Sequence, residues 1–186
     1  PRRIVGAGHS MGGASLTMAE INRPRTFDRL VLIEPIIFPP PFERFDHPLV
    51  TGALRRRAVF PDRPTAHANF AAKSVFADWD ERSLGAYVKG GFVDTDEGVR
   101  LRCDPADEAE TFRGGSAHGA YARLGEIDTP VLLLAGERST THPAGFIADL
   151  RQRFTNASAS IVAGAGHFLP MERPDLVAEM IHEFVS

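Results

Sequence analysis

Cysteine is nearly absent from this chain of 186 residues, in which Cys103 is the only one. A single cysteine excludes an internal disulfide, and without a second cysteine or a well-spaced histidine pair we expect no metal site. Positive charge is not in excess either, since the net charge is −3 and the isoelectric point is near 6.2. The chain therefore lacks the footprint of a nucleic-acid partner, and we expect a small-molecule partner instead.

Long hydrophobic runs are missing as well. No apolar stretch approaches the length of a transmembrane helix, so we expect no membrane partner. We place the chain in the cytoplasm, although a signal peptide would lie before Pro1. At 186 residues the chain is long enough to bury a sizeable core.

The most informative motif stands at the start of the chain, in the run Gly8-His9-Ser10-Met11-Gly12. The preceding residues 2–7 predict a short buried strand, and residues 11–21 carry apolar side chains at helical spacing. A turn this tight between a strand and a helix strains its central residue, and Gly8 and Gly12 remove side chains that would collide. Ordinary glycine-rich turns share the bare pattern, but its position between strand and helix favours Ser10 as an exposed nucleophile.

A second motif lies near the carboxyl end, in the run Gly164-Ala165-Gly166-His167-Phe168. It follows residues 159–163, which predict a strand, and precedes a helix that Pro174-Asp175 announces. His167 therefore lies on a loop at the end of a strand. An imidazole titrates near neutral pH, so His167 is the candidate general base for Ser10.

The early serine and the late histidine together resemble the α/β-hydrolase superfamily, whose triad runs nucleophile, acid, histidine along the chain. The resemblance covers nearly the whole chain, and the two motifs look like the branch of esterases, epoxide hydrolases and haloalkane dehalogenases. It implies an α/β fold, with a sheet of mostly parallel strands flanked by helices, a mainly helical cap and no cofactor. We expect hydrolase core at residues 1–38 and 126–186, and the cap at 39–125.

The acid of the triad departs from the family pattern. After the strand at 130–135, members usually read glycine, two residues and aspartate, but here Ser139 stands at the position of the aspartate. Some members carry the acid after an earlier strand, and the strand at 30–33 ends in Glu34-Pro35. We therefore favour Glu34 as the acid over a solvated strand-end glutamate, with Glu137 as the alternative.

Further residues are expected around the triad. The backbone N–H of Met11 would donate to the oxyanion, and a second donor would come from a loop that precedes this sequence. The candidates for contact with the substrate are His9, Phe38, Trp79 and Phe168. Cap aromatics such as Trp79 also suit the cap's own core, which we favour for that group. No partner pattern accompanies His118, His142 or His182, and they receive no role.

The resemblance implies a serine hydrolase that acts on an uncharged ester or related carbonyl through an acyl-enzyme. Epoxide hydrolases and dehalogenases need an aspartate nucleophile, so Ser10 argues against both. Thioesterases, lactonases, C–C hydrolases and haloperoxidases use the same serine frame and are not separated from esterases by sequence. The alternative is a catalytically incomplete fragment, or a partner-dependent half, of such an enzyme, because the chain begins in the strand of Ser10. Self-association or an amino-terminal segment would then cover the exposed strand edge.

Overall fold

The computed structural model describes residues 3–186, so Arg2 of the predicted first strand lies outside the described residues. Contacts divide the chain into two units. The first takes the beginning of the chain up to Glu43 and its end from Ser116, and the second runs from Arg44 to Gly115. The sequence predicts an insertion at 39–125, and its role as a cap stays a prediction.

The first unit is built on a sheet of parallel strands. Its strands β1 (Val5–His9), β2 (Arg29–Ile33), β6 (Val131–Gly136) and β7 (Ala157–Val162) lie in the order β1-β2-β6-β7. All three pairings are parallel, which requires a crossover between neighbouring strands. Helix α1 (Met11–Asn22) connects β1 to β2, and helix α6 (Ala144–Arg153) connects β6 to β7. The predicted α/β fold is confirmed.

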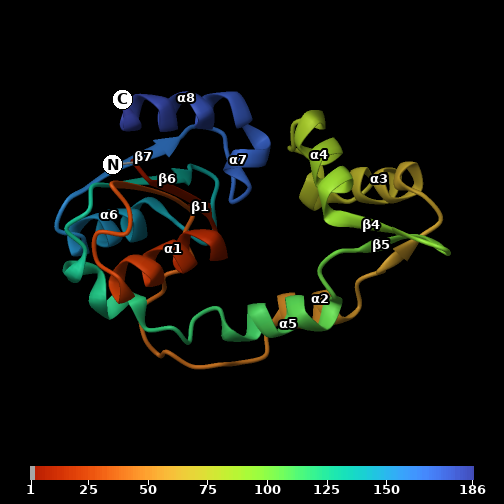
Figure 1. The fold of residues 1–186 in the computed structure, drawn as a ribbon, viewed down its shortest axis with the longest axis horizontal. Coiled ribbons are helices and arrows are strands. Elements are labelled where there is room, and N and C mark those ends of the chain that lie inside the picture. Colours follow the sequence, from red (N-terminus) through yellow and green to blue (C-terminus); the bar gives the residue numbers. More distant parts are fainter. Residues whose placement is uncertain (1–2) are drawn as a thin grey trace. The chain divides into compact units, whose positions relative to one another are not determined.

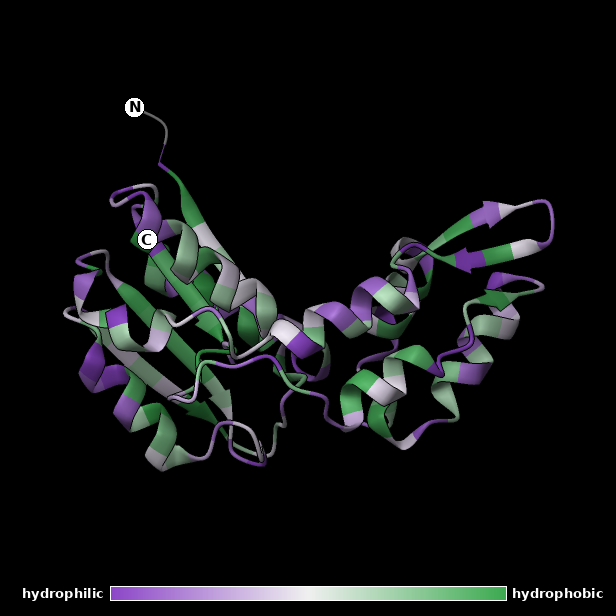
Figure 2. Cartoon of the chain, turned by 90° about the horizontal axis from the view of Figure 1, so that it is seen from below, coloured by the Kyte–Doolittle hydropathy of each residue, from purple (hydrophilic) through white to green (hydrophobic). Residues whose placement is uncertain are grey.

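Helices cover both faces of this sheet. Helices α1 and α6 and the 3-10 helix η2 (Ala120–Glu126) pack on one face, and α7 (Leu169–Glu172) and α8 (Pro174–Val185) pack on the other (Figure 1). The strands between them are largely hydrophobic, as expected for a sheet buried on both sides (Figure 2). Successive residues of β2 alternate between the two faces, with Leu30 and Leu32 on the first and Val31 and Ile33 on the second.

Strand β1 forms one edge of the sheet in the described part of the chain. Ile4 and Val5 are 49% and 37% exposed there, although both are large apolar residues. An exposed apolar edge is a site for pairing with another strand. Its coverage by a further segment or a second copy stays a prediction. Among residues 3–186, no helix is both long and apolar enough to cross a membrane.

The second unit combines short helices with a small antiparallel sheet. Its sheet has the order β3-β5-β4, formed by β3 (Val59–Phe60), β5 (Gly98–Leu101) and β4 (Phe92–Thr95). Around it lie α2 (Pro48–Leu54), α3 (Arg63–Ala71), the 3-10 helix η1 (Ser74–Phe76), α4 (Glu81–Gly91) and α5 (Pro105–Gly114). Aspartates at the N-caps accept backbone N–H groups and explain three of the helix starts: Asp62, Asp80 and Asp104.

Aromatic side chains make the core of the second unit. Phe60, Phe70 and Phe92 are each at most 2% exposed and their ring centroids lie within 6.0 Å of one another. Phe76 and Tyr87 pack against this cluster. These aromatics therefore form the unit's own core, which is the alternative favoured from the sequence.

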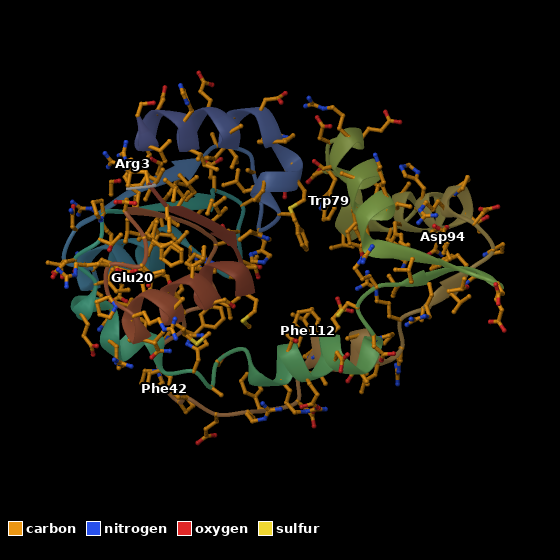
Figure 3. All side chains as sticks on the ribbon, in the orientation of Figure 1. Arg3, Glu20, Phe42, Trp79, Asp94 and Phe112 are labelled. Atoms are coloured by element: carbon orange, nitrogen blue, oxygen red, sulfur yellow. The ribbon has the colours of Figure 1, made fainter. Side chains whose placement is uncertain are left out.

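A buried carboxylate fixes the turn between α1 and β2. Glu20, labelled in Figure 3, is 2% exposed and accepts the backbone N–H groups of Arg25, Thr26 and Phe27 at 2.7–3.2 Å. Its Oε1 also accepts the hydroxyl of Thr129 at 2.7 Å, from the residue pair before β6. One side chain thus connects the helix, the turn and the start of the neighbouring strand.

Replacing Glu20 with leucine is expected to lower the free energy of unfolding by about 2–4 kcal/mol, because four donors lose their acceptor in a partly buried turn. Urea denaturation of the intact protein measures the change. The exposed Glu126, which pairs with Arg123 on the surface, is the control, and Glu126→Leu is expected to leave the midpoint unchanged. Equal midpoints for Glu20→Leu and the unmodified protein would contradict this role of Glu20.

Candidate active site

Ser10 occupies the turn between β1 and α1 with a strained backbone. Its φ is 54°, in the left-handed region that residues other than glycine rarely adopt. The N–H of Ser10 donates to the carbonyl of Ile33 at 2.9 Å, and its own carbonyl accepts from Ile36 at 3.1 Å. The turn is therefore fastened to the segment that follows β2. The strained conformation predicted from the motif is confirmed.

Two glycines make the turn possible, and only one of them is predicted by the motif. A Cβ at Gly8 would lie 2.6 Å from the carbonyl carbon of Gly12, and a Cβ at Gly13 would lie 2.9 Å from Cβ of Pro35. Both approaches are too close for any side chain. A Cβ at Gly12 would meet no atom of the described residues within 4 Å beyond its chain neighbours and the backbone of its own helix. The prediction that Gly12 removes a collision is wrong, and Gly13 is the second glycine that the turn requires.

Met11 is the first residue of α1. The N–H groups in the first turn of a helix have no acceptor within the helix, and the helix dipole makes this end electropositive. The Met11 N–H is thus placed next to Ser10 at the end of the helix that favours negative charge. Its role as an oxyanion donor stays a prediction.

Glu34 and His167 lie in contact. Glu34 follows β2 with a φ of 48°, and its side chain is fully buried. Its Oε2 lies 3.0 Å from Nδ1 of His167, in the loop after β7. A carboxylate at this position accepts the Nδ1–H and leaves Nε2 of His167 as the nitrogen that can take a proton. The structure therefore brings together the acid and the base predicted from sequence.

The Glu34 carboxylate is surrounded by donors. Its Oε1 accepts the N–H of Gly136 at 2.8 Å, and its Oε2 accepts the hydroxyl of Ser139 at 2.6 Å. Ser139, which stands at the position of the aspartate in the family pattern, thus donates to the Glu34 carboxylate from the loop after β6. Burial alone would raise the pKa of Glu34, but hydrogen bonds from two histidine rings, Ser139 and Gly136 hold that pKa well below its usual range. Glu34 is therefore ionised.

Two residues that touch this carboxylate were not predicted from the sequence. Nδ1 of His142 lies 2.8 Å from Oε2 of Glu34, and the Thr141 hydroxyl lies 3.2 Å from the same oxygen. The Thr141 hydroxyl also lies 3.2 Å from Nδ1 of His167. The only sequence signal is their place in the polar loop after β6, since no spacing rule relates them to a residue more than a hundred positions earlier.

His9 connects the turn of Ser10 to the loop of His167. Its Nε2 lies 2.8 Å from the carbonyl oxygen of His167, and because a carbonyl only accepts, Nε2 carries the proton and donates. The centroids of the two rings are 4.9 Å apart. Burial lowers the pKa of His9 to about 4, so the ring is neutral at neutral pH. The ring centroids of Phe168 and His167 are 5.3 Å apart. Contact of His9 and Phe168 with the substrate stays a prediction.

Two other glutamates hold the histidine loop. Oε2 of Glu137, the alternative acid, accepts the N–H of Gly164 at 2.9 Å. Oε2 of the buried Glu172 accepts the N–H of Gly166 at 2.8 Å. The structure places Glu34, rather than Glu137, against the His167 ring.

Two predicted substrate contacts lie in different units. Phe38 belongs to the first unit, and its ring lies 5.8 Å from those of His142 and Phe146. Trp79, labelled in Figure 3, belongs to the second unit and packs against Phe76 at 4.8 Å. Their contact with a substrate stays a prediction.

Glu34, His142 and His167 are the group in the described residues whose possible metal-binding atoms all lie within 4.8 Å of one another. Those atoms are already joined by hydrogen bonds, since both Nδ1 atoms lie within 3.0 Å of the same carboxylate oxygen. The ring nitrogens and the carboxylate oxygen that could bind a metal are thus occupied by contacts with one another, and we assign no metal ligands here.

Comparison with known proteins assigns the fold to a family. The family model described as "Alpha/beta hydrolase family" matches residues 1–180 of this sequence. The chain belongs to the alpha/beta hydrolase family. The resemblance seen in the motifs of Ser10 and His167 is thereby confirmed.

Relatives of this hydrolase-family chain include proteins of fungi and bacteria. It is 25% identical over 223 residues to the abhydrolase domain-containing protein AKT2 of Alternaria alternata, covering 98% of this chain and 83% of the relative. It is 24% identical over 193 residues to a putative esterase/lipase of Haemophilus influenzae, covering 99% of this chain and 61% of the relative.

Among solved structures, the chain is similar to the peroxisomal alpha-beta-hydrolase Lpx1 of Saccharomyces cerevisiae. The TM-score is 0.83 at 23% sequence identity, and the match covers 100% of this chain and 54% of Lpx1. This likeness concerns the fold. The chain spans about half of Lpx1 and less than two thirds of the esterase/lipase.

Proposed function

We propose that this chain carries the catalytic triad of a serine hydrolase, with Ser10 as nucleophile, His167 as general base and Glu34 as acid. The observation that carries the proposal is the 3.0 Å contact between Glu34 Oε2 and His167 Nδ1, and it is supported by the strained strand-to-helix turn that holds Ser10. Family membership supports it. The substrate class is an uncharged ester or related carbonyl compound, and the similarity to a putative esterase/lipase agrees with this choice.

The reaction follows from the protonation states of the three residues. Ser10 Oγ attacks the carbonyl carbon while Nε2 of His167 takes its proton, and Glu34 stabilises the imidazolium through Nδ1–H. The Met11 N–H donates to the oxyanion of the tetrahedral intermediate. The imidazolium then protonates the leaving alcohol, which leaves an acyl ester on Ser10. Water, deprotonated by His167, attacks this ester and releases the acid and free Ser10.

A fluorophosphonate probe tests the nucleophile in the intact protein. We expect one adduct, located by mass spectrometry on Ser10, because the probe reacts with a serine that a neighbouring base activates. His167→Gln is expected to label much more slowly. Ser15, whose hydroxyl donates to the Met11 carbonyl on the surface of α1, supplies the control, and Ser15→Ala is expected to label at the unmodified rate. An adduct on any other serine would remove Ser10 from the proposed mechanism.

A further inference from the structure

The ring of His142 has a hydrogen-bond partner at each nitrogen. It is 1% exposed, and its Nε2 lies 2.8 Å from the carbonyl oxygen of Pro35. A backbone carbonyl can only accept, so Nε2 carries a proton. The contact holds the ring in one orientation beside the segment that follows Glu34.

The other nitrogen faces a carboxylate. Nδ1 of His142 lies 2.8 Å from Oε2 of Glu34, closer than the 3.1 Å that separates it from the Thr141 hydroxyl. An ionised carboxylate also only accepts hydrogen bonds, and Glu34 already accepts them from the Gly136 N–H and the Ser139 hydroxyl. A neutral ring would leave an unprotonated Nδ1 2.8 Å from this negative oxygen, whereas a proton on Nδ1 makes the contact attractive.

We propose that His142 is held as an imidazolium that forms a buried ion pair with Glu34 and thereby acts as a positioning residue for His167. The inference rests on the proposed function, since it gives Glu34 two histidine partners with different tasks. His167 exchanges its proton with the substrate, whereas His142 keeps both of its protons throughout the reaction. The ion pair compensates the charge of a carboxylate that is fully buried.

His118 provides a contrast within the same unit. Its Nε2 lies 2.7 Å from the carbonyl of Ile36, next to Pro35, so this nitrogen also donates. Its Nδ1, however, accepts the backbone N–H of Ala120 at 3.2 Å and therefore carries no proton. Two histidines thus bind neighbouring carbonyls, and their second partners set different protonation states.

The charge on His142 has a consequence for the base. The rings of His142 and His167 are nearly parallel, with centroids 6.2 Å apart. A cation at this distance disfavours a second positive charge on His167. In the part of the chain that the structure describes, two titratable groups face the His142 ring, Glu34 from the end of β2 and His167 from the loop after β7, and the neutral His9 lies beyond His167. The aromatic rings packed against His142 belong to Phe38 and Phe146 and carry no charge.

Nuclear magnetic resonance tests the protonation state directly. In the intact protein with 15N-labelled histidine, two-bond correlations from the ring C–H protons report whether each ring nitrogen carries a proton. We expect two protonated nitrogens for His142 and only Nε2 protonated for His118, with signals assigned from His142→Gln and His118→Gln. The measurement needs no turnover, so it stands even if Ser10 proves not to be the nucleophile. A single protonated nitrogen on His142 at neutral pH would overturn the ion pair.

The pH dependence of kcat/KM tests the effect on His167. His142→Asn keeps a neutral amide donor toward Glu34 and removes the charge. Without the cation His167 binds a proton more readily, so the acidic limb of the profile is expected to move up by about one pH unit. His118→Gln is expected to leave the limb in place.

A structural role alone would lower the rate without moving the limb. A folded His142→Asn variant whose limb coincides with that of the unmodified protein would therefore overturn the positioning role. If this variant fails to fold, His142→Gln, which keeps a donor toward the Pro35 carbonyl, is measured in its place.

Discussion

Replacing Ser10 with alanine is expected to lower kcat by about 10⁵- to 10⁶-fold, because loss of the nucleophile removes the acyl-enzyme route altogether. KM is expected to change little, since the hydroxyl contributes mainly to the reacting state. The variant keeps the strained φ of 54° and the contact of its N–H with Ile33. Hydrolysis of a nitrophenyl ester by the intact protein measures the loss.

The control for this experiment lies one helical turn away. Ser15→Ala removes a hydroxyl from the same helix and is expected to retain normal turnover. An unchanged thermal midpoint in Ser10→Ala would show that the loss is chemical rather than structural. Turnover within about tenfold of the unmodified protein would mean that another group attacks the substrate.

Glu34→Gln is expected to lower kcat by about 10⁴-fold, as does loss of the charged acid in other serine triads. The amide cannot stabilise the imidazolium of His167, and it presents a donor where the Nδ1–H needs an acceptor at 3.0 Å. It also removes the charge that faces His142 at 2.8 Å. Steady-state kinetics, with circular dichroism to verify folding, give the result.

Glu137→Gln is the matched control. Glu137 is exposed and holds the N–H of Gly164, an acceptor role that the glutamine oxygen can take over. We expect less than about a tenfold change in kcat. A larger loss in Glu137→Gln than in Glu34→Gln would move the acid to the loop after β6.

The sequence predicts the residues whose chemistry depends on local pattern. Together with the family resemblance, a strand that ends in Glu34-Pro35 and a serine at position 139 favour Glu34 as the acid, and the structure places Glu34 Oε2 3.0 Å from Nδ1 of His167. The helix that Pro174-Asp175 announces is α8, because proline at the first helical position marks its start locally.

The contacts of His142 and Thr141 with Glu34 were not predictable. His142 and Thr141 reach Glu34 only because β6 pairs in parallel with β2, which brings their loops to the same end of the sheet. The space available to a side chain at a glycine position is not predictable from sequence either. A Cβ at Gly13 would collide with Pro35, whereas one at the adjacent Gly12 would not.

The position of Glu34 also bears on the order in which the site assembles. Ser10 and Glu34 flank a single β-α-β unit, in which α1 connects two adjacent parallel strands. Contacts of short sequence separation form with a small loss of chain entropy, so we expect Ser10 and Glu34 to acquire their spacing from local folding. His167 joins them from 133 residues beyond Glu34. We therefore expect the contact between Glu34 and His167 to form after Ser10 and Glu34 are in place.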